Sequence, residues 1–209
     1  VNGLHASEKY DIYITGSNAF LLSSDLATLF TGRTFEIKVY PFSFKEYVEY
    51  FQLTDRYNAL SEYLKEGGMA GSYVYSNQEA KYDYIEDVFN TLIIRDIRQK
   101  YKIRNVQMMN QIVDFLMDNI SNLTSARNIA DILGKSNQKV HHTTVGTYIE
   151  YLCNAFAFYK IRRYDIRGKK YLASNDKYYL SDHAVRYAKL GTRNMDYGRM
   201  LENIVAIEL

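Results

Sequence analysis

The chain has 209 residues, of which 47% are hydrophobic and 24% charged, a balance typical of a folded globular protein and not of a disordered one. Its 26 basic and 24 acidic residues leave a net charge of +2, which neither requires nor excludes a nucleic-acid partner. Because Cys153 is the single cysteine, an intramolecular disulfide and a cysteine-rich zinc site are both excluded. We expect a cytoplasmic protein without a membrane partner, since no stretch is apolar and long enough to predict a membrane span.

The first predicted element is a buried strand over 10–14, followed by small polar residues. Open α/β sheets bind ligands at the carboxyl ends of their strands, and glycine lets the backbone approach a phosphate closely. Thr15, Gly16 and Ser17 are therefore candidate nucleotide-binding residues. The sequence contains no Gly-x-x-x-x-Gly-Lys-Ser/Thr loop. We therefore expect an internal fragment of a longer protein, which binds no nucleotide alone.

A short helix is predicted over 25–30, and the alternation of Phe35, Ile37 and Val39 with polar residues predicts a half-buried strand. Arg33 stands just before this strand. Its guanidinium is always ionised and presents a planar fork of donors, which suits the charge that develops on a γ-phosphate. Arg33 is thus a candidate catalytic residue, and the alternative is a surface arginine at the start of a strand.

Three helices are predicted next. Ser43 and Glu46 form a capping box at the start of the first, the second covers about 57–66, and the third starts with a capping box from Ser76 to Glu79. The third helix is predicted to run to about residue 100. Basic residues near its end line either a nucleic-acid path or a solvated helix face: Arg95, Arg98, Lys100, Lys102 and Arg104.

From residue 105 the order of predicted elements is three amphipathic helices and then a β-hairpin, which is typical of a winged helix-turn-helix. The third helix, around 144–154, would enter the major groove of DNA, and the wing would contact phosphates. The candidate DNA-binding residues of the wing are Arg162, Arg163, Arg167, Lys169 and Lys170. Glu150 on the third helix would repel phosphate, so a protein-packing module is the alternative.

Seven motifs together resemble a family of prokaryotic AAA-type P-loop ATPases whose C-terminal region combines a winged helix with a restriction-endonuclease-like domain. They run from one end of the chain to the other. The motifs are Tyr13-Ile14-Thr15-Gly16-Ser17-Asn18-Ala19, Leu21-Leu22-Ser23, Leu26-Ala27-Thr28, Thr31-Gly32-Arg33, Pro41-Phe42-Ser43-Phe44-Lys45-Glu46-Tyr47, Arg95-Asp96-Ile97 and Gly198-Arg199-Met200-Leu201-Glu202-Asn203-Ile204-Val205.

The resemblance implies an α+β, predominantly helical fold with four parts. These are the end of an AAA-type α/β core at 1–40, a helical lid at 41–104, a winged helix at 105–181 and the start of a nuclease-like domain at 182–209. It implies ATP and Mg²⁺ as cofactors of the intact parent, with Asn18 as the polar sensor beside the γ-phosphate and Arg33 as its catalytic companion. The alternative for Asn18 is a simple turn.

The resemblance also implies that the acidic metal ligands of the parent lie elsewhere, so we expect no metal site in this chain. Glu202 resembles the acid on the first helix of the nuclease-like fold, and Asp182 ends a probable strand. Double-stranded DNA and further copies of the chain are the expected partners. Two rival functions stay open: a non-enzymatic winged-helix DNA-binding regulator, and a protein-interaction module.

Overall fold

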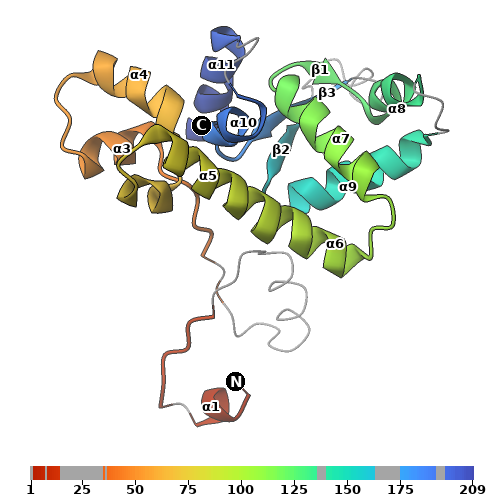
Figure 1. Cartoon of the computed structure of the whole chain (residues 1–209). Helices are drawn as coiled ribbons and strands as arrows, with labels where there is room; N and C mark the ends of the chain where they lie inside the picture. The colour runs from red at the N-terminus through yellow and green to blue at the C-terminus, as the bar shows by residue number, and fades with distance from the viewer. Residues whose placement is uncertain are drawn as a thin grey trace, which may run out of the picture.

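A computed structural model gives the fold and describes residues 2–7, 9–14, 35, 37–135, 140–162, 175–191 and 196–209. Within these ranges the chain is an α+β structure in which helices predominate and the sheet has three short strands. Figure 1 shows a helical body from which the N-terminal residues lead away. The predicted fold class, α+β and predominantly helical, is confirmed.

The elements of the first half of the body are, in chain order, α3 (Phe44–Tyr50), α4 (Arg56–Glu66), the 3₁₀ helix η1 (Ala70–Val74), α5 (Gln78–Val88), the π-helix η2 (Phe89–Arg95) and α6 (Asp96–Tyr101). Those of the second half are α7 (Val106–Asp118), β1 (Leu123–Thr124), α8 (Ala126–Gly134), α9 (His142–Asn154), β2 (Phe158–Ile161), β3 (Asp176–Leu180), α10 (Ala184–Leu190) and α11 (Tyr197–Glu208).

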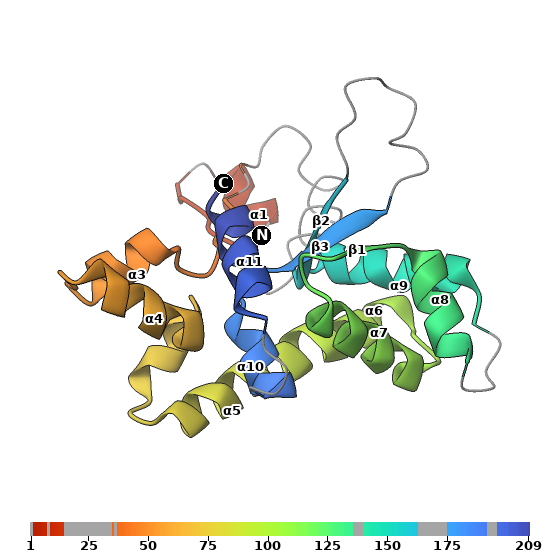
Figure 2. The ribbon, with the colours of Figure 1, turned by 90° about the horizontal axis from the view of Figure 1, so that it is seen from above.

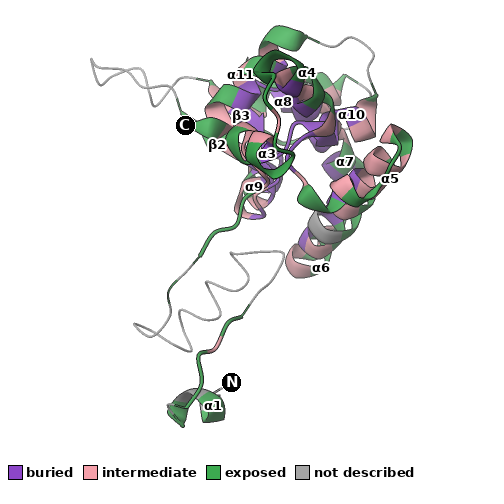
Figure 3. Ribbon diagram, turned by 90° about the vertical axis from the view of Figure 1, so that its left-hand side faces the viewer, coloured by how far each residue is buried: buried purple, intermediate pink, exposed green. Residues whose placement is uncertain are grey.

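The N-terminal segment differs from the prediction. It contains the short helix α1 (Asn2–Ala6), but the described residues 9–14 and 37–40 form no strand. Most of their apolar side chains are exposed, Tyr13 by 84% and Val39 by 90%. A strand needs a neighbour that pairs its N–H and C=O groups, and within the described part of the chain neither segment lies beside one. Figure 3 shows this exposure along the N-terminal segment.

The start of α3 is the one that the sequence predicts. The Ser43 hydroxyl accepts a hydrogen bond from the Glu46 N–H at 3.2 Å, and the Glu46 carboxylate accepts one from the Ser43 N–H at 2.8 Å. These reciprocal bonds satisfy two donors at the helix start. The start of α5 differs by one residue, since Asn77 and not Ser76 caps it, with its side chain accepting from the Ala80 N–H.

Helices α5 and α6 are joined without a break by the π-helical segment η2. The sequence predicts one helix to about residue 100, and the chain indeed stays helical to Tyr101. The sequence periodicity did not predict that Phe89–Arg95 would form a wider π-helical turn within this helix. Ile85, Phe89 and Ile97 of this long helix are buried.

The three strands form an antiparallel sheet in the order β1-β3-β2. Leu123 of β1 is paired with Lys177 of β3, and Phe158 of β2 with Leu180 of β3. In Figure 2 the sheet lies beside α7, α8 and α9. The predicted apolar stripes of α7 and α9 are buried: Met109, Ile112, Val113, Leu116 and Ile120 around α7, and Val145, Tyr148, Ile149 and Leu152 on α9. Of the predicted α8 stripe, Ile129 and Ala130 are buried, and Ala126 and Leu133 are partly buried against the same core.

One hydrophobic core connects the long helix to the sheet. It contains Phe89 and Ile97 from the α5–α6 helix, Met109 from α7, Leu180 from β3 and Val185 from α10. The helices before and after the predicted boundaries at 104/105 and 181/182 thus share this core. A smaller aromatic cluster around Tyr47 and Tyr63 packs α3 and α4 together, and Ile204 of α11 completes it.

Candidate nucleic-acid interface

Most of the residues that the sequence predicts for a functional site lie outside the described residues. This holds for the nucleotide-binding candidates Thr15, Gly16 and Ser17, for the catalytic candidates Asn18 and Arg33, for the wing residues Arg163, Arg167, Lys169 and Lys170, and for the helix predicted over 25–30. Arg162 is described. It follows directly after β2, and its side chain is exposed.

Helix α9 presents a polar outer side. Val145, Ile149 and Leu152 point into the core, whereas Thr143 and Thr147 are exposed. The sequence of α9 contains no lysine or arginine, and Glu150 is exposed on the same helix. A surface for nucleic acid centred on α9 therefore depends on cations from neighbouring elements.

The root of the predicted wing supplies part of this charge. Lys160 of β2 lies 2.7 Å from the Asp176 carboxylate of β3, so this pair is largely neutralised across the two strands. Arg162 is the next cation along the chain and is exposed. Within the described residues, the positive charge at the wing root therefore comes mainly from Arg162.

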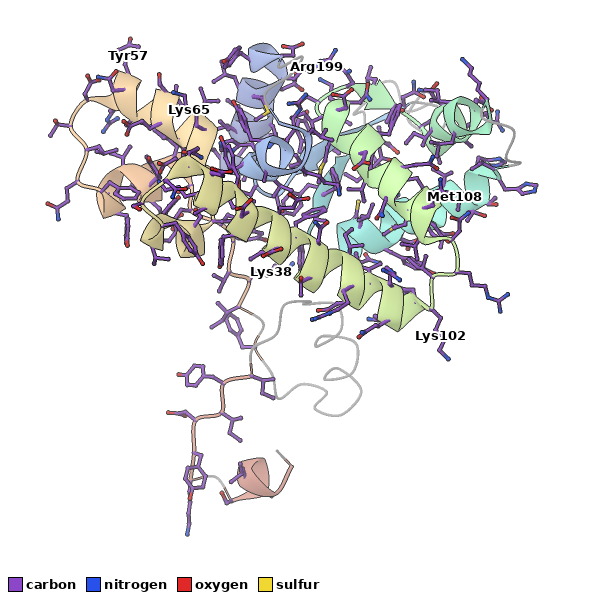
Figure 4. The ribbon with its side chains drawn as sticks, in the orientation of Figure 1. Lys38, Tyr57, Lys65, Lys102, Met108 and Arg199 are labelled. Carbon is purple, nitrogen blue, oxygen red and sulfur yellow. The ribbon has the colours of Figure 1, made fainter. Side chains whose placement is uncertain are left out.

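A second group of cations lies at the end of the long helix. Arg98, Lys102 and Arg104 are exposed, and Figure 4 shows Lys102 at the end of α6, projecting away from the body. Tyr101 connects this helix end to α9, because its ring stacks on that of Tyr151 with centroids 3.5 Å apart and an interplanar angle of 6°. These cations, for which the sequence left open a nucleic-acid path or a solvated helix face, therefore lie close to α9.

A buried polar junction, which the sequence did not predict, connects α4 to the corner between β3 and α10. Asp182 is 3% exposed and accepts hydrogen bonds from the Gly68 N–H and the Ala184 N–H, both at 2.8 Å. A Cβ at Gly67 would lie 2.2 Å from the Asp182 carboxylate, so this position requires glycine. The only sequence signal is the Gly67-Gly68 pair, whose partner is more than a hundred residues away.

His183 belongs to the same junction. Its Nε2 lies 2.7 Å from the main-chain carbonyl oxygen of Tyr63. Because a carbonyl only accepts, this nitrogen carries a proton and donates it. Burial lowers the pKa of His183 below its usual range, although the neighbouring Asp182 acts in the opposite direction. The imidazole is thus a neutral structural link between α4 and α10.

Two polar side chains attach α11 to β3. The Asn203 amide pairs with both main-chain groups of Leu180, accepting from its N–H at 2.8 Å and donating to its C=O at 3.1 Å. Glu202 accepts hydrogen bonds from Lys177 at 2.6 Å and Tyr179 at 2.8 Å. Partial burial opposes ionisation of Glu202, but these hydrogen bonds outweigh it and lower its pKa.

The described residues contain no group of three or more His, Cys, Asp or Glu side chains that could hold a metal ion. Cys153 is a free thiol, and burial raises its pKa to about 11, so it is not a reactive thiolate. Within the same ranges, no helix has the length and apolar character needed to cross a membrane.

Residues 57–196, from α4 to the residue before α11, match the model of a family described as a domain of unknown function, DUF8612. The chain belongs to the DUF8612 family. Residues 1–48, before this DUF8612 region, match a second family model, described as an AAA domain. The N-terminal part of the chain is therefore AAA-type.

Two curated relatives match the chain over nearly its whole length. An uncharacterized protein of Haemophilus influenzae is 38% identical over 213 residues, covering 100% of this chain and 53% of the relative. An uncharacterized protein of Methanocaldococcus jannaschii is 26% identical over 211 residues, covering 96% and 47%. The chain thus spans about half the length of the curated relatives it matches. No solved structure matches it.

Proposed function

We propose that the full-length protein is an AAA-type ATPase in which the DUF8612 region carries a winged helix that contacts duplex DNA. The match of residues 1–48 to an AAA domain supports the first part. The relatives are about twice as long as this chain, which leaves room for the remainder of an ATPase core. The motif around Pro41 and the sensor-like Asn18 also resemble those of AAA-type ATPases.

ATP and Mg²⁺ are the cofactors that an AAA-type domain implies. The described residues do not fit them, because they contain no acidic or histidine cluster for a metal ion, and the sequence has no Gly-x-x-x-x-Gly-Lys-Ser/Thr loop. A complete nucleotide site therefore needs further residues. We propose Asn18 and Arg33 as this chain's catalytic contribution and Thr15, Gly16 and Ser17 as its contribution to nucleotide binding.

The observation that carries the winged-helix proposal is topological. The element order α7-β1-α8-α9-β2-β3, with sheet order β1-β3-β2, is three helices interleaved with a three-stranded antiparallel sheet. In a winged helix of this order, the third helix reads the major groove and the β2–β3 connection is the wing. On this proposal α9 is the recognition helix, and the wing lies in the connection between β2 and β3.

The proposed DNA contact is tested by charge reversal in the wing. A variant in which Arg162, Arg163, Lys169 and Lys170 are all changed to Glu should lose duplex binding in a gel shift at low salt. A melting temperature close to that of the wild type would show that the loss comes from the reversed charge and not from unfolding. Equal binding by both proteins would overturn the proposed DNA contact.

A protein-contact module is the second candidate function. It is favoured by the absence of any lysine or arginine in α9 and by the exposed Glu150, which weaken this helix as a DNA reader. In that case no salt-dependent complex with arbitrary duplex DNA forms. A non-enzymatic DNA-binding regulator would instead keep the duplex complex without any ATP turnover in the full-length protein.

A further inference from the structure

The long helix formed by α5, η2 and α6 is polarised in charge. Its first part, 78–88, carries four acidic residues and one lysine. The segment 95–104 carries five cations and a single acidic residue, Asp96. The basic end therefore produces a local positive field that the net charge of +2 conceals.

Four of these five cations are exposed, and Lys100 is partly buried. Ile97 is fully buried, whereas Arg98 and Lys102, one turn apart, are both exposed. Arg95 is 3.3 Å from Asp96, and this pair is partly neutralised. Among the residues that the structure describes, Arg98, Lys102 and Arg104 form no ion pair with an acidic side chain. Their charges are therefore available to a ligand.

Contacts of Tyr101 fix the position of these cations relative to α9. This ring stacks on Tyr151 of α9. Arg98 precedes Tyr101 by three residues, and Lys102 follows it directly. The exposed cations thus flank the C-terminal end of α9, the helix that has no basic residue of its own.

We propose that Arg98, Lys102 and Arg104 form a second phosphate-binding site, which holds the backbone of a DNA duplex lying along α9. This inference rests on the proposed DNA contact of the winged helix. Charge complementarity selects the ligand, because these long, unpaired side chains suit sequence-independent contacts with backbone phosphates. Their positive charge also offsets the repulsion between Glu150 and DNA phosphates, which no basic residue within α9 can offset.

The test is the salt dependence of binding, measured by fluorescence anisotropy with the whole chain and a labelled duplex of about 30 base pairs. Each phosphate contact contributes about −0.9 to the slope of log K against log salt concentration. The double variant Arg98→Gln and Lys102→Gln should therefore reduce the magnitude of the slope by about 2 and weaken binding at low salt. Arg98→Lys, which keeps the charge, should retain the slope.

A matched control is available at the other end of the molecule. Arg56 and Lys65 are exposed cations of α4, and Figure 4 shows Lys65 far from Lys102. Arg56→Gln with Lys65→Gln removes the same charge and should leave the slope unchanged. Thermal melts verify that both double variants are folded.

The outcomes separate this inference from the proposed function. If the wild type binds the duplex and the wing variant does not, but Arg98→Gln with Lys102→Gln keeps the full slope, the second site is wrong and the wing contact stands. Equal loss of slope in the α4 control would also overturn the second site, since it would show a general charge effect. If the wild type does not bind duplex DNA at all, both proposals fall.

Discussion

At the scale of single residues, the junctions of this fold depend on polar side chains that pair with main-chain groups. Asn203 of α11 is fully buried. Its side-chain amide is hydrogen-bonded to both the N–H and the C=O of Leu180. Neither helix propensity nor hydrophobic periodicity marks such a residue in advance. Its partner lies in another element, so only the tertiary arrangement gives it a role.

Asn203→Ala should lower the free energy of unfolding by about 2–4 kcal/mol, because it leaves buried polar groups of β3 unpaired. Urea unfolding followed by circular dichroism measures this. Asn110 is an exposed asparagine on α7 and serves as the control. Its change to Ala should stay within about 0.5 kcal/mol of the wild type. A loss below about 1 kcal/mol for Asn203→Ala would contradict the structural role assigned here.

At the scale of elements, the glycines that end α4 and α10 have the same backbone conformation but different surroundings. Comparing them separates the cost of backbone strain from the cost of a steric clash. Gly67 ends α4 with φ 71° and ψ −167°, and Gly191 ends α10 with φ 71° and ψ −166°. Both conformations are strained for a residue with a side chain. A Cβ at Gly191 would meet nothing within 4 Å, whereas one at Gly67 would collide with Asp182.

Gly191→Ala should therefore cost about 1–3 kcal/mol of unfolding free energy through strain alone. Gly67→Ala should cost at least about 2 kcal/mol more, because the corner between β3 and α10 must move or lose the bonds of Asp182. Denaturant unfolding of the two variants gives the difference directly. Equal costs would mean that the contact between α4 and this corner is soft and contributes little.

Much of the element order could be predicted from the sequence, because helix starts and apolar stripes are local signals. The Ser43–Glu46 capping box and the stripe of α7 are examples. The strands predicted over 10–14 and 35–39 are the counterexample, since alternation alone does not supply the neighbouring strand that a β-strand needs. The two strands of the predicted hairpin do form, as β2 and β3, because each has the other as a paired neighbour.

The candidate interface was predictable only in part. The basic composition of the wing and of the segment that contains Arg98 was visible in the sequence, but for that segment both a nucleic-acid path and a solvated face stayed open. What connects that segment to α9 is the stack of Tyr101 on Tyr151, a contact across fifty residues that no spacing rule indicates. The junction of Asp182 with Gly67 and Gly68 is non-local in the same way.

At the scale of the whole molecule, the chain joins an AAA-type N-terminal part to a helical body of the DUF8612 family. Phe42, near the start of this body, is hydrogen-bonded to it at both of its main-chain groups. The Phe42 N–H donates to the Gly68 carbonyl at 2.7 Å, and the Tyr63 hydroxyl donates to the Phe42 carbonyl at 2.7 Å. Since Asp182 binds the Gly68 N–H, this connection continues to the corner beside β3.

The most direct test of the account is ATP turnover by the full-length protein, measured with and without duplex DNA. We predict turnover that the duplex changes, and a loss of about 10- to 1,000-fold in both Asn18→Ala and Arg33→Ala, with a smaller change in ATP affinity. Asn110→Ala, far from the proposed nucleotide site in sequence, should leave turnover unchanged. Absence of ATP turnover, or turnover within about twofold of the wild type in both variants, would contradict the account.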